Sequence, residues 1–254
     1  MKKTIIRILR SLTAPIRKNE KFFIPFKDVV ASHASEHLYR AVRMIRKSGC
    51  TTKGKQILDL GANDGSTTRF FAVHFPECQV TGFEPIQAMF TKAQDTIRNY
   101  PNASLIKVAC SDSEGEADFH VSANFLSSSL LPGRQEELEK ESVDYQKAVA
   151  ETSLEKVKTT RLDTAAKDLK EILLIKIDTQ GTELMILQNG IETLKKTQFV
   201  LTEVNNHTMY ENTCQYYEVD TFLRSQGFKL ADLVVTYRDS NYIVKEFDVL
   251  YAKA

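Results

Sequence analysis

The twelve residues from Ile57 to Thr68, ILDLGANDGSTT, constrain the fold of this chain more than any other stretch. Apolar residues alternate with Asp59, and Gly61 and Gly65 then frame a short polar loop that leads into hydroxyl residues. Glycine permits left-handed backbone angles and a close approach to a ligand, and hydroxyl side chains cap helices. The stretch therefore predicts a strand, a tight turn and a helix start, with a ligand site at the first crossover of a parallel sheet.

The rest of the chain alternates between strand-like and helix-like patterns. Residues 172–177 form an apolar run whose only charge is Lys176, as expected of a strand buried on both faces. This alternation predicts an α/β fold with a doubly wound, mostly parallel sheet and an antiparallel edge strand. The predicted strands are residues 56–60, 79–84, 104–110, 172–177 and 199–204, an extra strand at 116–121, an edge strand at 156–162, and an antiparallel pair at 233–235 and 246–251. The predicted helices are residues 33–47, 66–73, 86–100, 164–169, 184–194 and 217–226.

Composition and length are typical of one globular domain. The chain has 254 residues, of which 42% are hydrophobic and 26% charged, and this argues against disordered and fibrous classes. The formal net charge of +1 gives no general reason to expect a nucleic-acid partner. The four cysteines lack paired spacing and a neighbouring histidine, so we expect reduced thiols in a cytoplasmic protein.

Residues 1–32 form a predicted basic extension before a single domain at residues 33–254. The first 20 residues contain six basic side chains and one acid, Glu20. Arg7 interrupts the apolar residues, so a signal-peptide core or a membrane span is not expected there. Two interpretations stay open: a short amphipathic helix that makes peripheral contact with an anionic membrane, or a solvated extension.

Residues 122–155 stand out because the apolar pattern weakens there. Ser127, Ser128 and Ser129 precede a turn, and a stretch rich in Glu and Lys follows from residue 134 to 147. Long irregular insertions in compact domains are often functional. We therefore expect a loop and then a solvated helix that together form a cap-like insertion near the active site, with a plain surface connection as the alternative.

The acidic residues around the glycine loop indicate which cofactor it binds. Its pattern, Asp59-x-Gly61-x-Asn63-x-Gly65, differs from the Gly-x-Gly-x-x-Gly of dinucleotide enzymes. Asp59 would repel a pyrophosphate but can accept hydrogen bonds from an ammonium group. Glu84 ends the next strand, 19 residues after Gly65, where a carboxylate can bind both ribose hydroxyls. These residues predict a site for S-adenosylmethionine; the alternative is a structural glycine turn with a solvent-facing Glu84.

Further acids end the neighbouring strands on the same edge of the sheet. Asp178 is predicted to lie near the methyl group, although it could also cap the next helix. Glu203 interrupts an apolar strand, so it should face a polar site or a cationic partner. Glu203 or His207 is predicted to orient the acceptor and take its proton. The primary prediction is a site without a metal ion. A site in which Asp178, Glu203 and Asn205 hold a divalent cation is the less favoured alternative.

Several motifs together resemble the FkbM-type methyltransferase family. They run in the family's order over roughly residues 56–235. The motifs are residues 57–68, Gly82-Phe83-Glu84-Pro85, Ala109-Cys110-Ser111-Asp112, Thr160-Arg161-Leu162-Asp163, residues 177–183 and Thr202-Glu203-Val204. The resemblance implies a class I, Rossmann-like methyltransferase fold and O-methylation, commonly of sugar or polyketide hydroxyls. It places the loop residues, Glu84 and Asp178 on the cofactor side and Ser111 beside the adenine. The full set of expected cofactor residues is Asp59, Gly61, Ala62, Asn63, Gly65, Ser66, Thr67, Glu84, Pro85, Ser111 and Asp178.

The expected function is thus S-adenosylmethionine-dependent O-methylation of a hydroxyl on a sugar, glycan or related metabolite. The preference for a glycan rests on the family resemblance alone. A nicotinamide-dependent oxidoreductase could share the fold, but Asp59 and Asn63 do not suit a phosphate-binding loop. A catalytically silent binding or scaffold protein is the third reading, and carboxylates at three strand ends argue against it.

Overall fold

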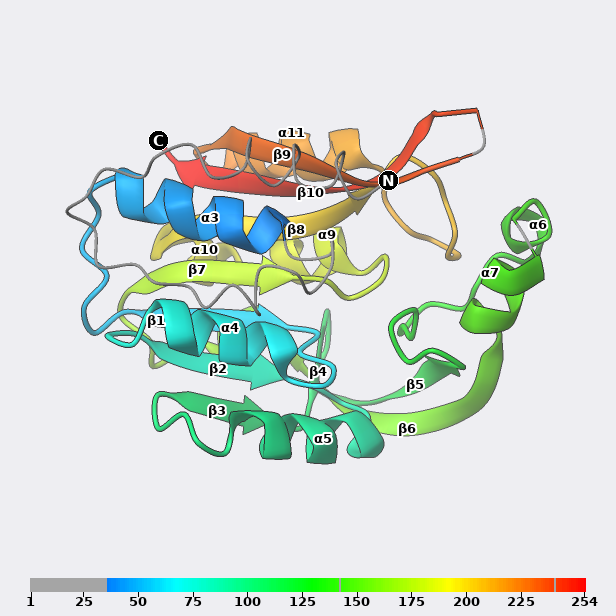
Figure 1. The fold of residues 1–254 in the computed structure, drawn as a ribbon, viewed down its shortest axis with the longest axis horizontal. Helices are drawn as coiled ribbons and strands as arrows, with labels where there is room; N and C mark the ends of the chain where they lie inside the picture. Colours follow the sequence, from blue (N-terminus) through cyan, green and yellow to red (C-terminus); the bar gives the residue numbers. More distant parts are fainter. Residues whose placement is uncertain (1–35, 142, 240) are drawn as a thin grey trace, which may run out of the picture. The chain divides into compact units, whose positions relative to one another are not determined.

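The computed structural model describes residues 36–141, 143–239 and 241–254 (Figure 1). The predicted basic extension and its membrane contact lie outside the described residues. The helices are α3 Glu36–Lys47, α4 Ser66–His74, α5 Gln87–Ile97, α6 Gln135–Leu138, α7 Val143–Val149, α8 Leu162–Ala165, α9 Glu183–Gln188, α10 Ile191–Lys195 and α11 Tyr216–Ser225. The strands are β1 Gln56–Leu60, β2 Gln79–Phe83, β3 Ala103–Ile106, β4 Ala109–Ser111, β5 Gly115–Ser122, β6 Glu151–Arg161, β7 Ile172–Ile177, β8 Thr197–Asn205, β9 Phe228–Arg238 and β10 Val244–Lys253.

The main sheet has seven strands in the order β3-β2-β1-β7-β8-β10-β9. The first five are parallel, and β10 runs antiparallel to both β8 and β9. The predicted mostly parallel sheet with an antiparallel element at its edge is confirmed. The order reverses between β1 and β7, and open sheets of this kind bind ligands at the carboxyl ends of the strands beside such a switch point.

Alternating side chains on the inner strands build a hydrophobic core on each face of the sheet. On β1, Ile57 packs with helices α3 and α4, while Leu58 packs with the helices α8 to α11. Every residue of β7 is buried, which confirms the prediction for this apolar run. In Figure 1, α3, α4 and α5 cover the near face of the sheet, with α11 behind it. Both faces are therefore covered, so the carboxyl edge is where a cleft can open.

Two predicted strands occupy different places in the structure. The strand predicted at residues 104–110 is split between β3, on the edge of the main sheet, and β4, in a second sheet of order β4-β6-β5. The backbone N–H of Val108 donates to the Ile106 carbonyl at 3.1 Å, and this turn separates the two segments. The edge strand predicted at residues 156–162 is the central strand β6 of that second sheet, because β4 and β5 pair with its two sides.

One predicted helix is also broken in two. Residues 184–194 form α9 and α10, which are separated at Asn189 and Gly190. A Cβ atom at position 190 would lie 2.5 Å from the Leu162 side chain. Gly190 therefore lets the chain pass close to α8 at this break. The spacing of apolar residues over 184–194 fits one continuous helix and did not predict the break.

The insertion lies at the carboxyl end of the main sheet, where Figure 1 shows α6 and α7 beyond β5 and β6. Several hydrogen bonds hold it to the rest of the domain, among them two from residues beside α6. The backbone N–H of Arg134 donates to the Met209 carbonyl at 2.8 Å, and the Tyr237 hydroxyl donates to Glu141 at 2.7 Å. That the insertion acts as a cap over the active site stays a prediction.

Three further findings concern the described residues. Residues 36–254 form one compact unit. In the described part of the chain no helix is both long and apolar enough to cross a membrane. All four cysteines are free thiols, and Cys78 and Cys110 are buried.

Candidate active site

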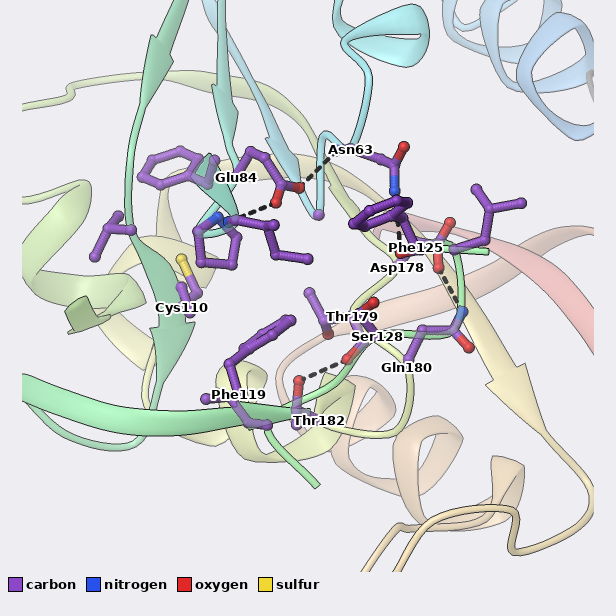
Figure 2. Close-up of a pocket in the computed structure, with 18 residues that line it drawn as sticks. Asn63, Glu84, Cys110, Phe119, Phe125, Ser128, Asp178, Thr179, Gln180 and Thr182 are labelled. Carbon is purple, nitrogen blue, oxygen red and sulfur yellow. Dashed lines mark hydrogen bonds between the residues drawn. The ribbon is translucent and has the colours of Figure 1, made fainter. Parts of the chain in front are cut away.

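A cleft of about 610 Å³ opens where the loops after β1, β2 and β7 meet the second sheet (Figure 2). Its walls combine apolar side chains with a few polar groups, as in most small-molecule sites. Figure 2 shows Glu84 and Cys110 on one side of the cleft and Asp178 and Gln180 on the other. Five residues predicted to bind the cofactor line it, namely Gly61, Asn63, Glu84, Pro85 and Asp178.

The glycine loop packs tightly against the end of β7 and against helix α5. Gly61 has a φ of +81°, and a Cβ atom there would lie 2.0 Å from the Asp178 carbonyl oxygen. Gly65 has a φ of +79°, and a Cβ atom there would lie 2.9 Å from the Ala93 backbone. Asn63 is itself left-handed, with a φ of 47°, and its side-chain amide donates to the Phe125 carbonyl at 3.2 Å. Tertiary packing, in addition to turn geometry, therefore requires the glycines.

Glu84 connects this loop to the end of β2. Its two carboxylate oxygens accept the backbone N–H groups of Asn63 at 2.9 Å and Ile86 at 2.8 Å. Burial raises the pKa of Glu84 to about 7, against the lowering effect of these two donors. A carboxylate in this position lines the cleft and has remaining lone pairs for a ligand.

A buried lysine joins the acids at the ends of β1 and β7. Lys176 Nζ lies 3.6 Å from Asp59 and 3.2 Å from Asp178, and Asp59 is fully buried. Asp59 Oδ2 accepts a hydrogen bond of 2.6 Å from the Thr68 hydroxyl, while its Oδ1 atom, which faces Lys176, has no hydrogen-bond partner. Burial raises the pKa of Asp59, whereas the Lys176 charge overcomes burial at Asp178 and lowers the pKa of that carboxyl. An ammonium group of the chain itself thus occupies the space between the two acids.

Gln180 links the site to the next strand. Its side-chain NH₂ group donates to Asp178 at 3.0 Å and to Glu203 at 2.8 Å, and its carbonyl oxygen accepts from the Tyr210 hydroxyl at 3.0 Å. Gln180 adopts a left-handed backbone with a φ of 57°, and its own carbonyl accepts from Ser129 at 2.7 Å. Burial and the nearby acids raise the pKa of Glu203 well above its usual value. The Gln180 side chain therefore connects the Tyr210 hydroxyl with two carboxyl groups, Asp178 and Glu203, whose pKa values are shifted in opposite directions.

Comparison with known proteins decides the family. The family model of the methyltransferase FkbM domain matches residues 59–230. This chain belongs to the FkbM methyltransferase family. The FkbM match covers the glycine loop, Glu84, the Lys176 cluster and Gln180, together with strands β2 to β8.

A curated relative and a solved structure agree with this assignment. The chain is 33% identical over 164 residues to the 2-O-methyltransferase NoeI of Sinorhizobium fredii (strain NBRC 101917 / NGR234). That alignment spans 61% of this chain and 65% of the relative. The magnesium protoporphyrin IX methyltransferase of Synechocystis PCC 6803 with bound SAH is 12% identical, with a TM-score of 0.50 over 99% of this chain and 95% of that one. At this identity the likeness shows the fold alone, which is the class I S-adenosylmethionine-dependent methyltransferase fold.

The remaining predicted residues of the FkbM domain do not line the cleft. His207 is buried, and its Nε2 atom lies 3.3 Å from Glu246. Glu203 reaches the cleft only through Gln180. Cys110 lines the cleft next to the predicted adenine neighbour Ser111, whose hydroxyl bonds Asp112. Residues predicted to bind the cofactor but absent from the lining are Asp59, Ala62, Gly65, Ser66, Thr67 and Ser111. Their contact with the cofactor stays a prediction.

Sequence reasoning overlooked three residues of this site. Lys176 was noted only as a charge in a buried strand, yet burying a lone ammonium is costly and in itself indicates acidic neighbours. Gln180 lies within the motif at residues 177–183, but no role was predicted for it. Phe125 lies 62 residues from its partner Asn63, so no local signal could connect them. As for the metal version of the site, the described residues contain no group of three or more His, Cys, Asp or Glu side chains that could hold an ion.

The close packing of the FkbM glycine loop gives a test of its role. Gly61→Ala should destabilise the domain by about 2 to 3 kcal/mol, because a left-handed alanine would also overlap the Asp178 carbonyl. Gly54→Ala is the matched control: its φ is +78°, and no atom lies within 4 Å of a Cβ there. It should cost only about 1 kcal/mol. Urea unfolding measures both, and equal losses would contradict the packing argument.

Proposed function

We propose that this protein transfers a methyl group from S-adenosylmethionine to a hydroxyl of a sugar, glycan or related metabolite. The observation that supports this best is Glu84, a carboxylate at the carboxyl end of β2 that lines the cleft beside Gly61. Family membership supports the methyl donor, and the name of the curated relative, a 2-O-methyltransferase, supports oxygen as the acceptor atom.

The residues of the cleft suit the three parts of this donor. Glu84 would accept hydrogen bonds from the ribose hydroxyls, and the apolar side chains of Ile86 and Phe119 would contact the adenine. Asp178 would bind the ammonium group of the methionine part, since its side chain is 38% exposed, whereas Asp59 is fully buried and already faces Lys176. Gly61 allows the donor to approach the backbone.

Methyl transfer requires positioning and removal of one proton. The acceptor oxygen forms a bond to the methyl carbon as the carbon–sulfur bond breaks, and the hydroxyl proton passes to a base. When bound, the sulfonium donor supplies the electrophilic carbon and leaves as a neutral thioether. We assign proton removal to Glu203 and the position near the methyl group to Asp178. Burial raises the pKa of Glu203, so its carboxylate binds a proton more strongly than that of Asp178, which Lys176 keeps ionised. His207 faces Glu246 and is left out of this assignment.

The acceptor in this proposal is uncharged and the protein cytoplasmic. Within the described residues, none of those that line the cleft is Lys or Arg, which argues against a polyanionic acceptor such as nucleic acid. The free thiols of all four cysteines support a reducing compartment. The buried acid pair around Lys176 likewise disfavours a pyrophosphate, and hence the nicotinamide-dependent alternative.

Calorimetric titration of the purified full chain with S-adenosylmethionine and with NAD tests the donor. We expect saturable binding of S-adenosylmethionine at one site and none of NAD. Transfer of labelled methyl to a panel of saccharides then tests the chemistry. Binding of NAD alone would favour an oxidoreductase, and binding of neither would favour a scaffold; each result would overturn the proposal.

A further inference from the structure

A second cleft of about 990 Å³ lies under the cap, between β5, the end of α7 and the loop after β8. Ser122, Tyr145, Gln146, Val149 and Tyr210 are among the residues that line it. The cap is fixed over this cleft by the contacts of Arg134 with Met209 and Thr208. The cleft is therefore a built feature of the domain.

The lining of this second cleft is polar but carries almost no charge. Among its described residues the charged types are limited to His120 and Glu151, which lie 2.7 Å from each other. Hydroxyl, amide and phenol groups make up most of the other polar lining. Such a surface offers hydrogen bonds to hydroxyl groups and an aromatic face to a sugar ring, and offers no cation to a phosphate.

The two clefts share a wall. Along β5, Phe119 faces the first cleft and the next residue, His120, faces the second. In the loop that follows, Ser128 lines the first cleft and Ser127 the second. Neighbouring residues of this segment thus line opposite clefts, so the segment separates the two.

Tyr210 and Gln180 meet where this wall ends. Tyr210 lines the second cleft and Gln180 the first, and the phenol contacts both the Gln180 side-chain oxygen and the Ser127 carbonyl at 3.0 Å. One phenol proton can serve only one of these acceptors fully. The other carbonyl oxygen can therefore accept a hydrogen bond from a ligand hydroxyl that approaches from the second cleft. This position lies beside the acidic residues of the first cleft.

We propose that the second cleft binds the methyl acceptor as an uncharged saccharide, with Tyr210 as the residue that positions its reacting hydroxyl toward Gln180. This inference rests on the proposed function and adds the place and the chemical class of the acceptor. The bond formation and proton transfer are those given above, so no further reactant is needed.

Saccharide binding can be measured without knowing the natural acceptor. The chain contains no tryptophan, so Tyr145→Trp places a single fluorophore in the second cleft. We expect lactose, maltose or cellobiose to change its emission saturably in the full chain loaded with S-adenosylhomocysteine. Glucose phosphate and an oligouridylate should not. Tyr217→Trp is the matched control, because Tyr217 is 61% exposed on α11. No saturable response to any neutral disaccharide, or a stronger response to the anionic probes, overturns the inference.

A pair of variants on α7 then tests whether the second cleft binds the methyl acceptor during the reaction. Val149→Trp fills the cleft, whereas Val143 is 63% exposed, so Val143→Trp points the same side chain into solvent. With the responding disaccharide, Val149→Trp should lower kcat/KM about tenfold or more and leave the Kd for S-adenosylmethionine unchanged. Val143→Trp should stay within about twofold of the parent.

The results separate the two proposals. Absence of S-adenosylmethionine binding to the parent chain would defeat the proposed function itself. Intact donor binding with wild-type kcat/KM in Val149→Trp, or saccharide binding without any methyl transfer, would overturn only the acceptor cleft. Thermal unfolding of each variant identifies a loss that comes from misfolding, and the Tyr145→Trp titration then decides independently.

Discussion

Glu84→Gln is expected to raise the Kd for S-adenosylmethionine about 100-fold. The substitution keeps the shape and one oxygen acceptor but removes the negative charge, and hydrogen bonds to charged groups are worth roughly 1.5 to 3 kcal/mol each. Glu84 also accepts two backbone N–H groups, so the loop geometry could respond. Calorimetry gives the Kd, and Glu116→Gln, at an exposed acid on β5, is the matched control. An unchanged Kd in Glu84→Gln would remove this residue from the donor site.

The pH dependence separates a direct role of Glu84 from a structural one. Because the pKa of Glu84 is raised to about 7, the carboxylate gains a proton as the pH falls through that value. Donor binding to the ionised form should therefore weaken about tenfold from pH 8 to pH 6. Burial also raises the pKa of Asp248 to about 7, so the difference between parent and Glu84→Gln isolates Glu84. The variant should show a flatter profile.

The raised pKa of Glu84 has the opposite effect on the stability of the ligand-free protein. A carboxyl group whose pKa is higher in the folded state than its usual 4.5 stabilises the fold below that usual value. This contribution is lost as the pH rises through about 7. The stability of the free protein and its affinity for the donor should thus depend on Glu84 with opposite sign.

Lys176→Met should destabilise the domain by about 3 to 5 kcal/mol, because it leaves buried Asp59 without its cation. Burial alone would lower the pKa of Lys176, but the charges of Asp178 and Asp59 raise it above its usual value. The lysine therefore stays charged in the folded state and its loss removes a compensating charge. Urea unfolding measures the change.

Two variants make this result specific. Adding Asp59→Asn to Lys176→Met should recover about 1 to 3 kcal/mol, since the unpaired carboxylate is then gone. Lys195→Met removes a surface lysine that is 63% exposed and paired with Glu192, and should change stability by less than about 1 kcal/mol. Additive effects of Lys176→Met and Asp59→Asn would show that the two residues are not coupled.

The sheet and the positions of the glycine loop and Glu84 followed from local patterns. The loop from Ile57 to Thr68 predicted a strand, a turn and a helix, and the structure has β1, the glycine turn and α4 there. The position of Glu84 after the next strand was enough to bring it beside this loop, since parallel neighbours end at the same edge. These features depend on residues close in sequence or on the periodicity of strands, which a sequence displays directly.

Only the tertiary structure decided which partner each acidic side chain has. The sequence determined that Asp59, Lys176, Asp178 and Glu203 lie at or near strand ends. Only the packing of β1 against β7 put Lys176 between Asp59 and Asp178, and only the turn at Gln180 joined Glu203 to the cleft while leaving His207 against Glu246. Electrostatic partners are set by distances between segments far apart in the chain, and such distances leave no periodic trace in the sequence.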